Sequence, residues 1–360
     1  MSSFTPSFLS AIRLPPLLVQ TIRMIGEHKG RQDLYRLQAP EKLENLRQVA
    51  VIQSVESSNR IEGVVAAPGR LEALLREKTT PRDRSEGEIA GYRDVLATVH
   101  EAAADIPFSE TVVLQFHRDL MKFSPQDGGR WKTSQNEIEE IRPDGSRFIR
   151  FSPTPPHLTE EAMQGLHKRF RDALKDGPHD PLILIPLYVL DFLCIHPFLD
   201  GNGRMARLLT VLALYHQGYE VGRYISLERL IEDTKESYYD TLYRSSQGWH
   251  ESKHDPVPWV EYWLGTLLAA YREMESRIGD LSTGHGTKTD IIILAIDRML
   301  GSFSISDLEA ACPTVSRDWI KTVLEQLKKE GRIELIGRGR GAKWRKAARP
   351  ETGGSTRNGV

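Results

Sequence analysis

The sequence has little cysteine and no strong charge imbalance. Two cysteines in 360 residues, Cys194 and Cys312, are too few for a disulfide framework or a four-ligand zinc site, and they favour a reducing compartment. The 48 basic and 49 acidic residues give a formal net charge of −1. This balance excludes a protein that is basic throughout and coats nucleic acid, but it is compatible with a local basic patch.

Long apolar runs and targeting signals are also lacking. The most apolar stretch, 181–199, is interrupted by Pro186, Asp191 and Pro197, whereas a membrane span needs about 20 mostly apolar residues. The N-terminus lacks a basic start that leads into an apolar run, so we predict no signal peptide. We expect a cytoplasmic protein without a membrane partner. At roughly 100–200 residues per domain, its length allows two or three domains.

The spacing of apolar residues predicts a mostly helical body. Helices are expected over 41–61, 85–105, 112–121, 159–174, 182–195, 204–216, 227–247 and 257–278. Gly63 follows the first of these, where glycine is favoured, and Ser85 and Glu88 have the spacing of a capping box in the second. Within 136–151, two short runs flank Pro143-Asp144-Gly145, which predicts a β-hairpin.

The character of the chain changes after a glycine-rich linker at 279–286. Helices are predicted at 289–300, 304–311 and 316–329, followed by a hairpin, which is the element order of a winged helix-turn-helix over 287–349. Residues 317–349 carry a net charge of +7, which leaves −8 for the rest. This asymmetry is compatible with DNA binding and equally with protein–protein contacts; a homodimer is left open. Residues 350–360 are predicted to be a disordered tail.

One twelve-residue segment, His196 to Arg207, concentrates the polar chemistry of the chain: HPFLDGNGRMAR. Gly201 and Gly203, on both sides of Asn202, allow the backbone to turn successive N–H groups toward one point. The helix that follows adds its own N–H groups and the positive end of its dipole. The segment therefore predicts an anion site suited to phosphates.

The side chains around this loop suit nucleotide-dependent transfer. Arg204 and Arg207, three residues apart on one helix face, match the charge of a polyphosphate. Asp200 is suited to Mg²⁺, which prefers one or two carboxylates together with phosphate oxygens. His196, with an ordinary pKa of about 6.5, is suited to accept a hydroxyl proton. Packing or a surface ion pair explains each residue alone, but their joint occurrence in one loop favours function.

A second interpretation of the same loop is a dinucleotide-binding site. Residues Gly201 to Ala206 match the GxGxxG/A fingerprint, and Glu220 would be the acid that binds the ribose. That fingerprint has to follow a β-strand directly. The apolar stretch before it has the length of a helix, so we rank this interpretation second.

Residues 196–207 resemble the signature of the Fic domain family, HPFx(D/E)GNGRxxR, at every specified position. The resemblance extends to 114–121, 129–136 and Tyr238-Tyr239, and it covers most of 35–265. It implies an all-α fold, with a compact Fic-type helical core at 106–280 that carries a small β-hairpin flap. An N-terminal helical region at 1–105 would precede this core.

The resemblance also implies an activity, the transfer of AMP from ATP to a Ser, Thr or Tyr hydroxyl of a target protein, with Mg²⁺. Carried over by position, it assigns these roles: general base, His196; Mg²⁺ ligand, Asp200; phosphate cradle, Gly201, Asn202 and Gly203; clamp on the β- and γ-phosphates, Arg204 and Arg207; adenine pocket, Tyr239 and Leu242. The flap would pair with the backbone of the target as an added strand. Here it is longer and more charged than the family's commoner form.

A shorter motif upstream resembles the family's inhibitory helix, (S/T)xxxE(G/N). Ser58 and Glu62 are four residues apart and share one face of a helix expected at about 41–63. The resemblance implies that Glu62 pairs with Arg207, so that ATP binds unproductively. The sequence thus predicts a self-inhibited protein adenylyltransferase, an AMPylator. Two alternatives stay open: removal of AMP by the same site, with Glu62 positioning a water, and an ATP-sensing transcriptional regulator that binds DNA through 287–349.

Overall fold

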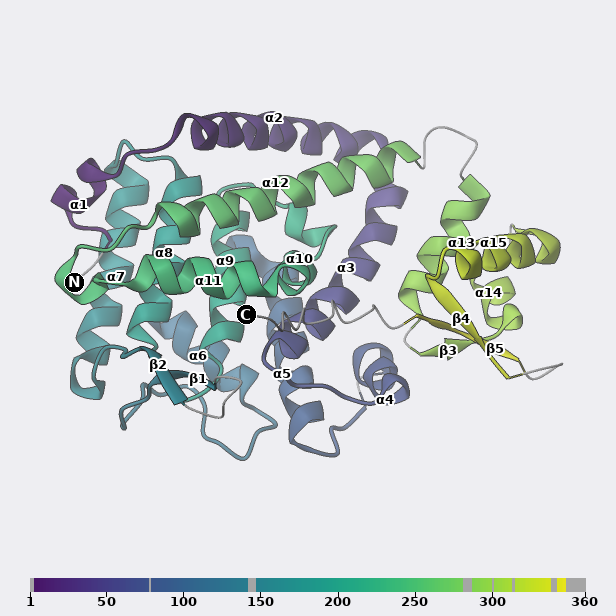
Figure 1. Ribbon diagram of the computed structural model, residues 1–360, viewed down its shortest axis with the longest axis horizontal. Helices are drawn as coiled ribbons and strands as arrows, with labels where there is room; N and C mark the ends of the chain where they lie inside the picture. The colour runs from purple at the N-terminus through teal and green to yellow at the C-terminus, as the bar shows by residue number, and fades with distance from the viewer. Residues whose placement is uncertain are drawn as a thin grey trace, which may run out of the picture. The chain divides into compact units, whose positions relative to one another are not determined.

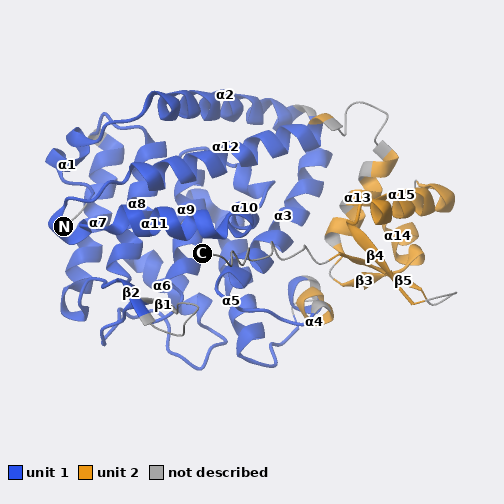
Figure 2. Cartoon of the chain, in the orientation of Figure 1, with its two compact units in different colours: residues 1–67, 73–278 blue, residues 68–72, 279–360 orange. Residues whose placement is uncertain are grey.

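The computed structural model describes residues 3–77, 79–141, 147–280, 287–299, 301–312, 315–337 and 342–347. It divides into two compact units (Figure 2), residues 1–67 with 73–278 and residues 68–72 with 279–360. The predicted tail at 350–360, the hairpin tip at 143–145 and most of the linker at 279–286 lie outside the described residues.

Within its described residues, the first unit is helical apart from one hairpin (Figure 1). Its longer helices are α1 (Pro6–Ala11), α2 (Pro16–Gln38), α3 (Pro40–Ile61), α5 (Arg84–Ala102), α6 (Glu110–Leu120), α7 (Pro156–Asp176), α8 (Pro181–Ile195), α9 (Asn202–His216), α10 (Leu227–Asp233), α11 (Lys235–Ser246) and α12 (Val257–Asp280). The hairpin consists of β1 (Ile138–Ile141) and β2 (Arg147–Phe151). The mostly helical fold expected from the apolar spacing is therefore confirmed.

Helix α8 forms the centre of this unit. It packs between α7 and α9, and every residue from Leu182 to Ile195 is buried, as expected of a helix that is apolar on all sides. Asp180 caps its start, because the carboxylate accepts a hydrogen bond from the Leu182 N–H at 2.8 Å. No helix within the described ranges combines the length and the apolarity that a membrane crossing requires.

Helix α3 ends as predicted, and the way it ends positions Glu62. Gly63 has φ of 77°, and the Gly63 and Val64 N–H groups donate to the Arg60 and Asn59 carbonyls at 2.9 Å each. These two bonds form a Schellman motif. They fix Glu62 as the residue that caps the end of the helix.

Two local predictions are wrong. The helix expected at 227–247 is divided at Thr234 into α10 and α11. The capping box of Ser85 and Glu88 is absent, because Asp83 caps α5 by accepting the Glu86 N–H at 2.9 Å. The helix therefore starts earlier than the capping-box spacing predicts, and Glu88 lies inside it with a different set of contacts.

The second unit contains α4 (Pro68–Glu72), α13 (Thr287–Arg298), β3 (Ser302–Phe303), α14 (Ile305–Ala311), α15 (Arg317–Lys329), β4 (Ile333–Ile336) and β5 (Lys343–Lys346). Its antiparallel sheet has the order β3-β5-β4. The sheet and the helices enclose a small core that includes Ile292, Leu308, Ile320 and Trp344. The predicted helices and hairpin are present, and assignment to the winged-helix class stays a prediction.

Close packing of α5 on α6 yields a test of the fold. An ideal Cβ on Gly91 would lie 2.0 Å from the Leu120 carbonyl oxygen, whereas nothing lies within 4 Å of one on Gly26 in α2. Gly91→Ala should lower the free energy of unfolding by about 1–3 kcal/mol, the usual cost of overpacking. Gly26→Ala should raise it by about 0.4–1 kcal/mol. Urea titration of both variants measures the difference, and equal stabilities would contradict the packing.

Candidate functional site

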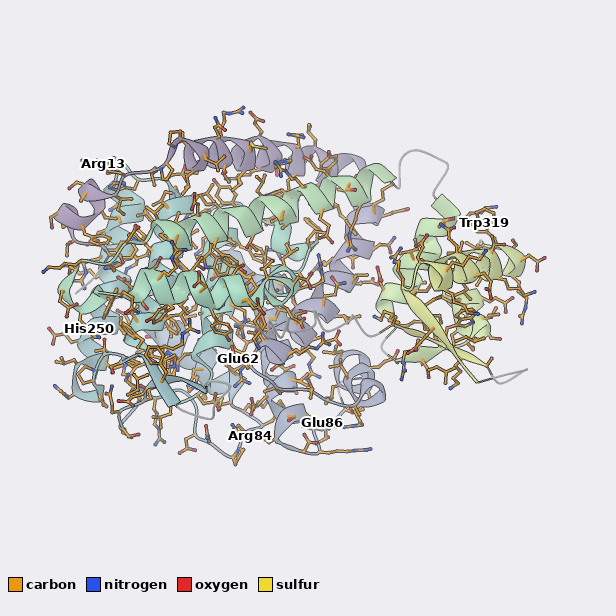
Figure 3. The ribbon with its side chains drawn as sticks, viewed as in Figure 1. Arg13, Glu62, Arg84, Glu86, His250 and Trp319 are labelled. Carbon is orange, nitrogen blue, oxygen red and sulfur yellow. The ribbon has the colours of Figure 1, made fainter. Side chains whose placement is uncertain are left out.

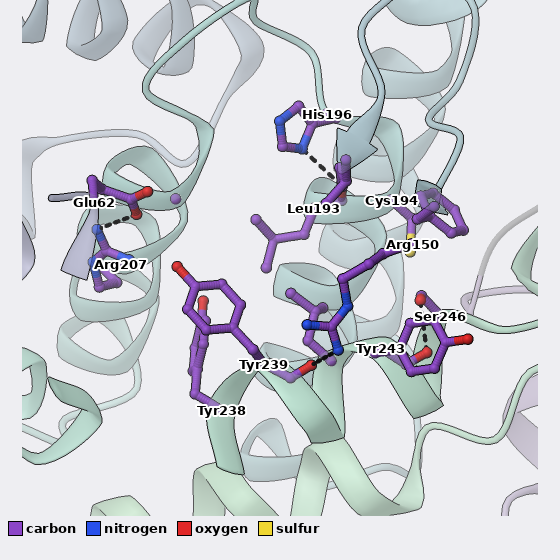
Figure 4. Close-up of a pocket in the computed structure, with 14 residues that line it drawn as sticks. Glu62, Arg150, Leu193, Cys194, His196, Arg207, Tyr238, Tyr239, Tyr243 and Ser246 are labelled. Atoms are coloured by element: carbon purple, nitrogen blue, oxygen red, sulfur yellow. Dashed lines mark hydrogen bonds and ion pairs between the residues drawn. The ribbon is translucent and has the colours of Figure 1, made fainter. Parts of the chain in front are cut away.

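A cavity of about 250 Å³ lies where α8, α9, α11 and the hairpin meet (Figure 4). Six of the residues singled out in the sequence line it: Glu62, His196, Gly203, Arg207, Tyr239 and Leu242. The remaining predicted residues, Ser58, Asp200, Gly201, Asn202 and Arg204, lie around these rather than on the cavity wall. The structure thus gathers in one place residues separated by up to 180 positions in the sequence.

His196 lies at the turn between α8 and α9, and a hydrogen bond of its ring leaves one nitrogen able to accept a proton. Its backbone has φ of 52° and ψ of 62°, a left-handed conformation that is rare for residues other than glycine. The imidazole Nδ1 lies 3.2 Å from the Leu193 carbonyl oxygen. Because a carbonyl only accepts, Nδ1 carries the proton and Nε2 keeps its lone pair.

Burial determines the charge of this ring. Burial, aided by the positive charge of Lys132, lowers the pKa of His196 to about 4, although the Leu193 carbonyl, Glu62 and Asp200 act in the opposite direction. The imidazole is therefore neutral at physiological pH. A neutral ring with a lone pair on Nε2 is the form that a general base requires.

The loop after His196 is braced by its own side chains. Asn202 accepts the Phe198 N–H at 3.0 Å and donates to the Phe198 carbonyl at 2.7 Å. The Phe198 ring is fully buried and stacks on His117, with 3.6 Å between ring centroids. The Asn202 side chain thus holds the loop closed, so only its backbone N–H is left for the predicted phosphate cradle.

Two residues that the motif analysis left without a role support the loop from outside. The Lys132 ammonium donates to the Ile195 carbonyl at 3.1 Å and to the Asn136 side chain at 2.8 Å. Burial lowers the pKa of Lys132 to about 8. The Asn136 amide in turn donates to the Phe198 carbonyl at 2.9 Å. The 129–136 segment resembled the family, but sequence spacing gave no indication of this bracing.

Arg207 is held by α3. Its Nη2 lies 2.8 Å from Glu62 Oε1 and donates to the Ser58 carbonyl at 2.8 Å, and its Nε donates to the Ser58 hydroxyl at 2.8 Å. The arginine is 2% exposed. Burial is the largest effect and acts to lower its pKa, but the Glu62 carboxylate and the neighbouring tyrosines together outweigh burial and the pKa is raised. Ser58, Glu62 and Arg207 therefore meet, as the resemblance implies.

The Glu62 carboxylate also covers the start of α9. A Cβ built on Gly203 would lie 2.2 Å from Glu62 Oε1, so only glycine leaves room for the carboxylate there. The first turn of a helix attracts anions, because its N–H groups and dipole present positive charge. Glu62 supplies a negative charge at the place where the sequence predicts a phosphate.

Arg204 and Asp200 belong to a second charged network. Arg204 is 1% exposed, and its Nη1 lies 2.7 Å from Glu88 Oε2. Its Nη2 lies 3.4 Å from Asp200 Oδ1, and Arg84 Nη2 lies 3.0 Å from Asp200 Oδ2. Sequence reasoning missed Arg84 and Glu88, because Glu88 was interpreted as a capping residue.

The far end of the cavity is formed by the hairpin and α11. β1 and β2 pair antiparallel, as predicted, with a register irregularity between Ile138 and Glu139. Figure 4 shows Arg150 of β2 directed at α11. It donates to the Tyr239 carbonyl at 3.4 Å, and its guanidinium lies 4.8 Å from the centre of the Tyr243 ring. The hairpin is thereby tied to the helix that carries Tyr239 and Leu242.

The metal expected here has one candidate ligand. Within the described ranges, no group of three or more His, Cys, Asp and Glu side chains could hold a metal ion. The Asp200 carboxylate is 32% exposed. A single partly exposed carboxylate fits Mg²⁺, which commonly takes one or two protein carboxylates and completes its shell with phosphate oxygens and water.

The dinucleotide interpretation is wrong. Its fingerprint requires a β-strand directly before Gly201, and residues 181–195 form helix α8. Glu220, the proposed ribose acid, is paired with Arg36 at 2.8 Å and with Arg223 at 3.4 Å. The loop therefore joins two helices, and it has no place in a sheet.

Comparisons with known proteins also find similarity to the Fic/DOC family. The sequence model of the Fic/DOC family matches residues 107–214. Protein adenylyltransferase Fic of Nematostella vectensis is 29% identical over 183 residues, 47% of this chain and 39% of that protein. Protein adenylyltransferase fic-1 of Caenorhabditis elegans is 24% identical over 245 residues, 65% of this chain and 43% of that protein. The chain spans less than half the length of these relatives.

Solved structures show the same fold. A Fic family protein from Desulfovibrio desulfuricans G20 superposes with a TM-score of 0.60 at 25% identity, over 93% of this chain and 97% of that one. Fic-1 of C. elegans superposes with a TM-score of 0.57 at 21% identity, over 74% of each chain. The second likeness concerns the fold alone.

The protonation of His196 can be measured directly. Titration of the histidine-labelled protein by NMR should give a midpoint at about pH 4 for His196, with Nδ1 protonated in the neutral ring; His196→Gln assigns the signal. Because this folded-state pKa lies below the unfolded value of about 6.5, stability should fall as pH decreases from about 6.5 to about 4. A midpoint near 6.5 would show that the ring is solvated and would contradict the described environment.

Proposed function

Residues 107–214 form a Fic/DOC family domain, and from this premise we propose that the chain is a self-inhibited protein adenylyltransferase. It transfers AMP from ATP to a Ser, Thr or Tyr hydroxyl of a target protein. The observation that carries the proposal is the joint placement of a neutral His196 on one side of the cavity and the Glu62–Arg207 ion pair on the other. A base and a masked anion site face the same space.

In the proposed reaction, His196 Nε2 removes the proton of the target hydroxyl. The hydroxyl oxygen forms a bond to the α-phosphorus of ATP, and the bond from that phosphorus to its bridging oxygen breaks, so that pyrophosphate leaves. A positioned general base contributes roughly 10²–10⁴-fold to such a rate. The first turn of α9 and its arginines supply positive charge to the phosphates.

Asp200 would hold Mg²⁺, which supplies additional positive charge to the phosphates when bound. The cavity region around Tyr239 and Leu242 would take the adenine ring, since these side chains offer apolar surface and the hairpin is tied to α11 beside them. The hairpin edge would add a strand to the backbone of the target. These assignments complete the proposed site.

Self-inhibition follows from the contacts of Arg207. Its guanidinium is engaged by Glu62 and Ser58, so a terminal phosphate has to displace a carboxylate from a buried arginine. Leaving a buried charge without a partner typically costs about 3–5 kcal/mol, so Arg207 would keep Glu62 until another anion takes its place. ATP would therefore bind without its terminal phosphate in place, and in-line transfer would be disfavoured.

The reverse activity, removal of AMP from a modified protein, would use the same residues. The Glu62 side chain is 31% exposed and lies on the cavity wall, where its carboxylate is suited to orient a water molecule. This position favours the reverse activity as the second candidate function.

The DNA-binding regulator draws no support from the described part of the second unit. Several of its basic side chains are paired with acidic ones: Arg317 with Glu309, Lys321 with Asp318, and Arg345 with Glu334. In these pairs an acidic side chain already engages the cation that would otherwise contact a phosphate. Trp319, labelled in Figure 3, is 41% exposed on α15. Salt-dependent DNA binding stays an untested prediction for 287–349.

Removing the Glu62 carboxylate tests the proposal. Glu62→Gly should raise the incorporation of AMP from ATP labelled at the α-phosphate into lysate proteins by about 100-fold, because Arg207 becomes available to the leaving phosphates. His196→Ala added to Glu62→Gly should abolish incorporation. Gel autoradiography and mass spectrometry of the adduct provide the measurement.

The matched control is Glu56→Gln, which removes a carboxylate from the same helix but breaks only its ion pair with Arg60. It should leave incorporation at the wild-type level. An inactive Glu62→Gly protein with unchanged thermal stability would count against adenylyl transfer, and equal activation by Glu56→Gln would count against the specific role of Glu62.

A further inference from the structure

Both oxygens of the Asp200 carboxylate are already engaged. Oδ1 accepts the Gly201 N–H at 2.6 Å and lies 3.4 Å from Arg204 Nη2. Oδ2 lies 3.0 Å from Arg84 Nη2. The residue that the proposed function gives to Mg²⁺ is therefore covered by two guanidinium groups.

The two arginines differ in their capacity to leave. The Arg204 side chain is 1% exposed and lies 2.7 Å from Glu88 Oε2, which is itself 5% exposed. The Arg84 side chain is 57% exposed. It begins α5 and is labelled in Figure 3. Only Arg84 can move into solvent without uncovering buried charge.

Glu88 pairs with both arginines, one on each of its carboxylate oxygens. Its Oε1 accepts from Arg84 Nε at 2.7 Å, while its Oε2 pairs with Arg204. The contact of Arg84 with Asp200 uses a different nitrogen, Nη2. When the Arg84 guanidinium leaves Asp200 for solvent, Glu88 therefore keeps Arg204 as a partner of opposite charge.

We propose that Arg84 is an exchangeable counter-ion of Asp200, which competes with the divalent cation for Oδ2 and thereby sets the affinity of the site for that cation. This inference rests on the proposed function, since it takes Asp200 as the metal ligand. A guanidinium and a divalent cation repel each other, so either of them at Oδ2 weakens the binding of the other. Arg84 is a positioning residue here, acting through Asp200.

The effect should have the size of an exposed ion pair. Such pairs contribute little to stability, and losing one changes a folding or binding equilibrium constant by roughly two- to fivefold. The dissociation constant of the cation should therefore fall by that factor when Arg84 is neutralised. Because Arg84 is exposed, the difference should shrink as ionic strength rises.

The test measures Mn²⁺ binding by electron paramagnetic resonance, in the Glu62→Gly protein with an ATP analogue that has a methylene group between the α- and β-phosphorus atoms. Arg84→Gln should bind Mn²⁺ about two- to fivefold more tightly. Arg84→Lys, which keeps the charge but loses the second nitrogen that reaches Asp200, should fall between the two. The matched control is Arg82→Gln, which removes the same charge from an exposed residue two positions away.

Three outcomes would overturn the inference: Arg84→Gln binds Mn²⁺ no more tightly than Arg82→Gln does, the gain persists undiminished in high salt, or Asp200→Asn leaves Mn²⁺ binding unchanged. The titration involves no transfer step. A Glu62→Gly protein that binds Mn²⁺ as described but transfers no AMP would therefore count against the proposed function and leave the competition at Asp200 standing.

Discussion

The buried guanidinium of Arg207 is the constraint on which the site depends. A charge taken out of water needs a partner of opposite sign, and the cost of leaving it alone is several kcal/mol. Glu62 is that partner here, and the C-terminal turn of α3 holds it in place through Gly63. Because Arg207 always needs an anion beside it, a triphosphate would enter the site only by replacing the Glu62 carboxylate. In the proposed function, inhibition and substrate binding would both meet this requirement by placing an anion beside Arg207.

The same logic extends to the other side of the loop. Arg204 is paired with Glu88, and Asp200 with Arg204 and Arg84, so each charge expected to meet nucleotide or metal has an intramolecular partner. The partners differ in burial: Glu88 is nearly buried, whereas Glu62 and Arg84 are partly exposed. The buried partners hold the loop in shape. The exposed ones are suited to exchange with ligands.

Local sequence patterns predicted those helix boundaries that are set by residues close together in the sequence. The helix boundaries around 196–207 and the end of α3 at Gly63 follow from apolar spacing and glycine, and the structure has them there. The split at Thr234 was not predictable, because the apolar residues on both sides continue one pattern. The start of α5 was misplaced because Asp83 and Ser85 are both good capping residues; Asp83 is the cap, and Glu88 pairs with Arg204 instead of completing a capping box.

Contacts between distant segments were predictable only through resemblance to a family. Nothing in the spacing of residues indicates that Glu62 meets Arg207 across 145 positions, or that Lys132 supports the carbonyl of Ile195. The role of Asn202 was half predicted: the residue belongs to the loop, but its side chain closes the loop instead of facing the cavity. Arg84 was missed altogether, since an exposed arginine at a helix start has no distinguishing pattern.

The central claim is that the first turn of α9 and Arg207 form a triphosphate site that Glu62 occupies. The most direct measurement is a crystal structure of the Glu62→Gly protein with the methylene analogue of ATP. The account predicts that the terminal phosphate contacts the Arg207 guanidinium. It also predicts that the α-phosphorus lies close enough to His196 for a target hydroxyl hydrogen-bonded to Nε2 to reach it. A nucleotide bound elsewhere would contradict the account. So would an Arg207 guanidinium that is hydrogen-bonded only to Ser58 and contacts no phosphate.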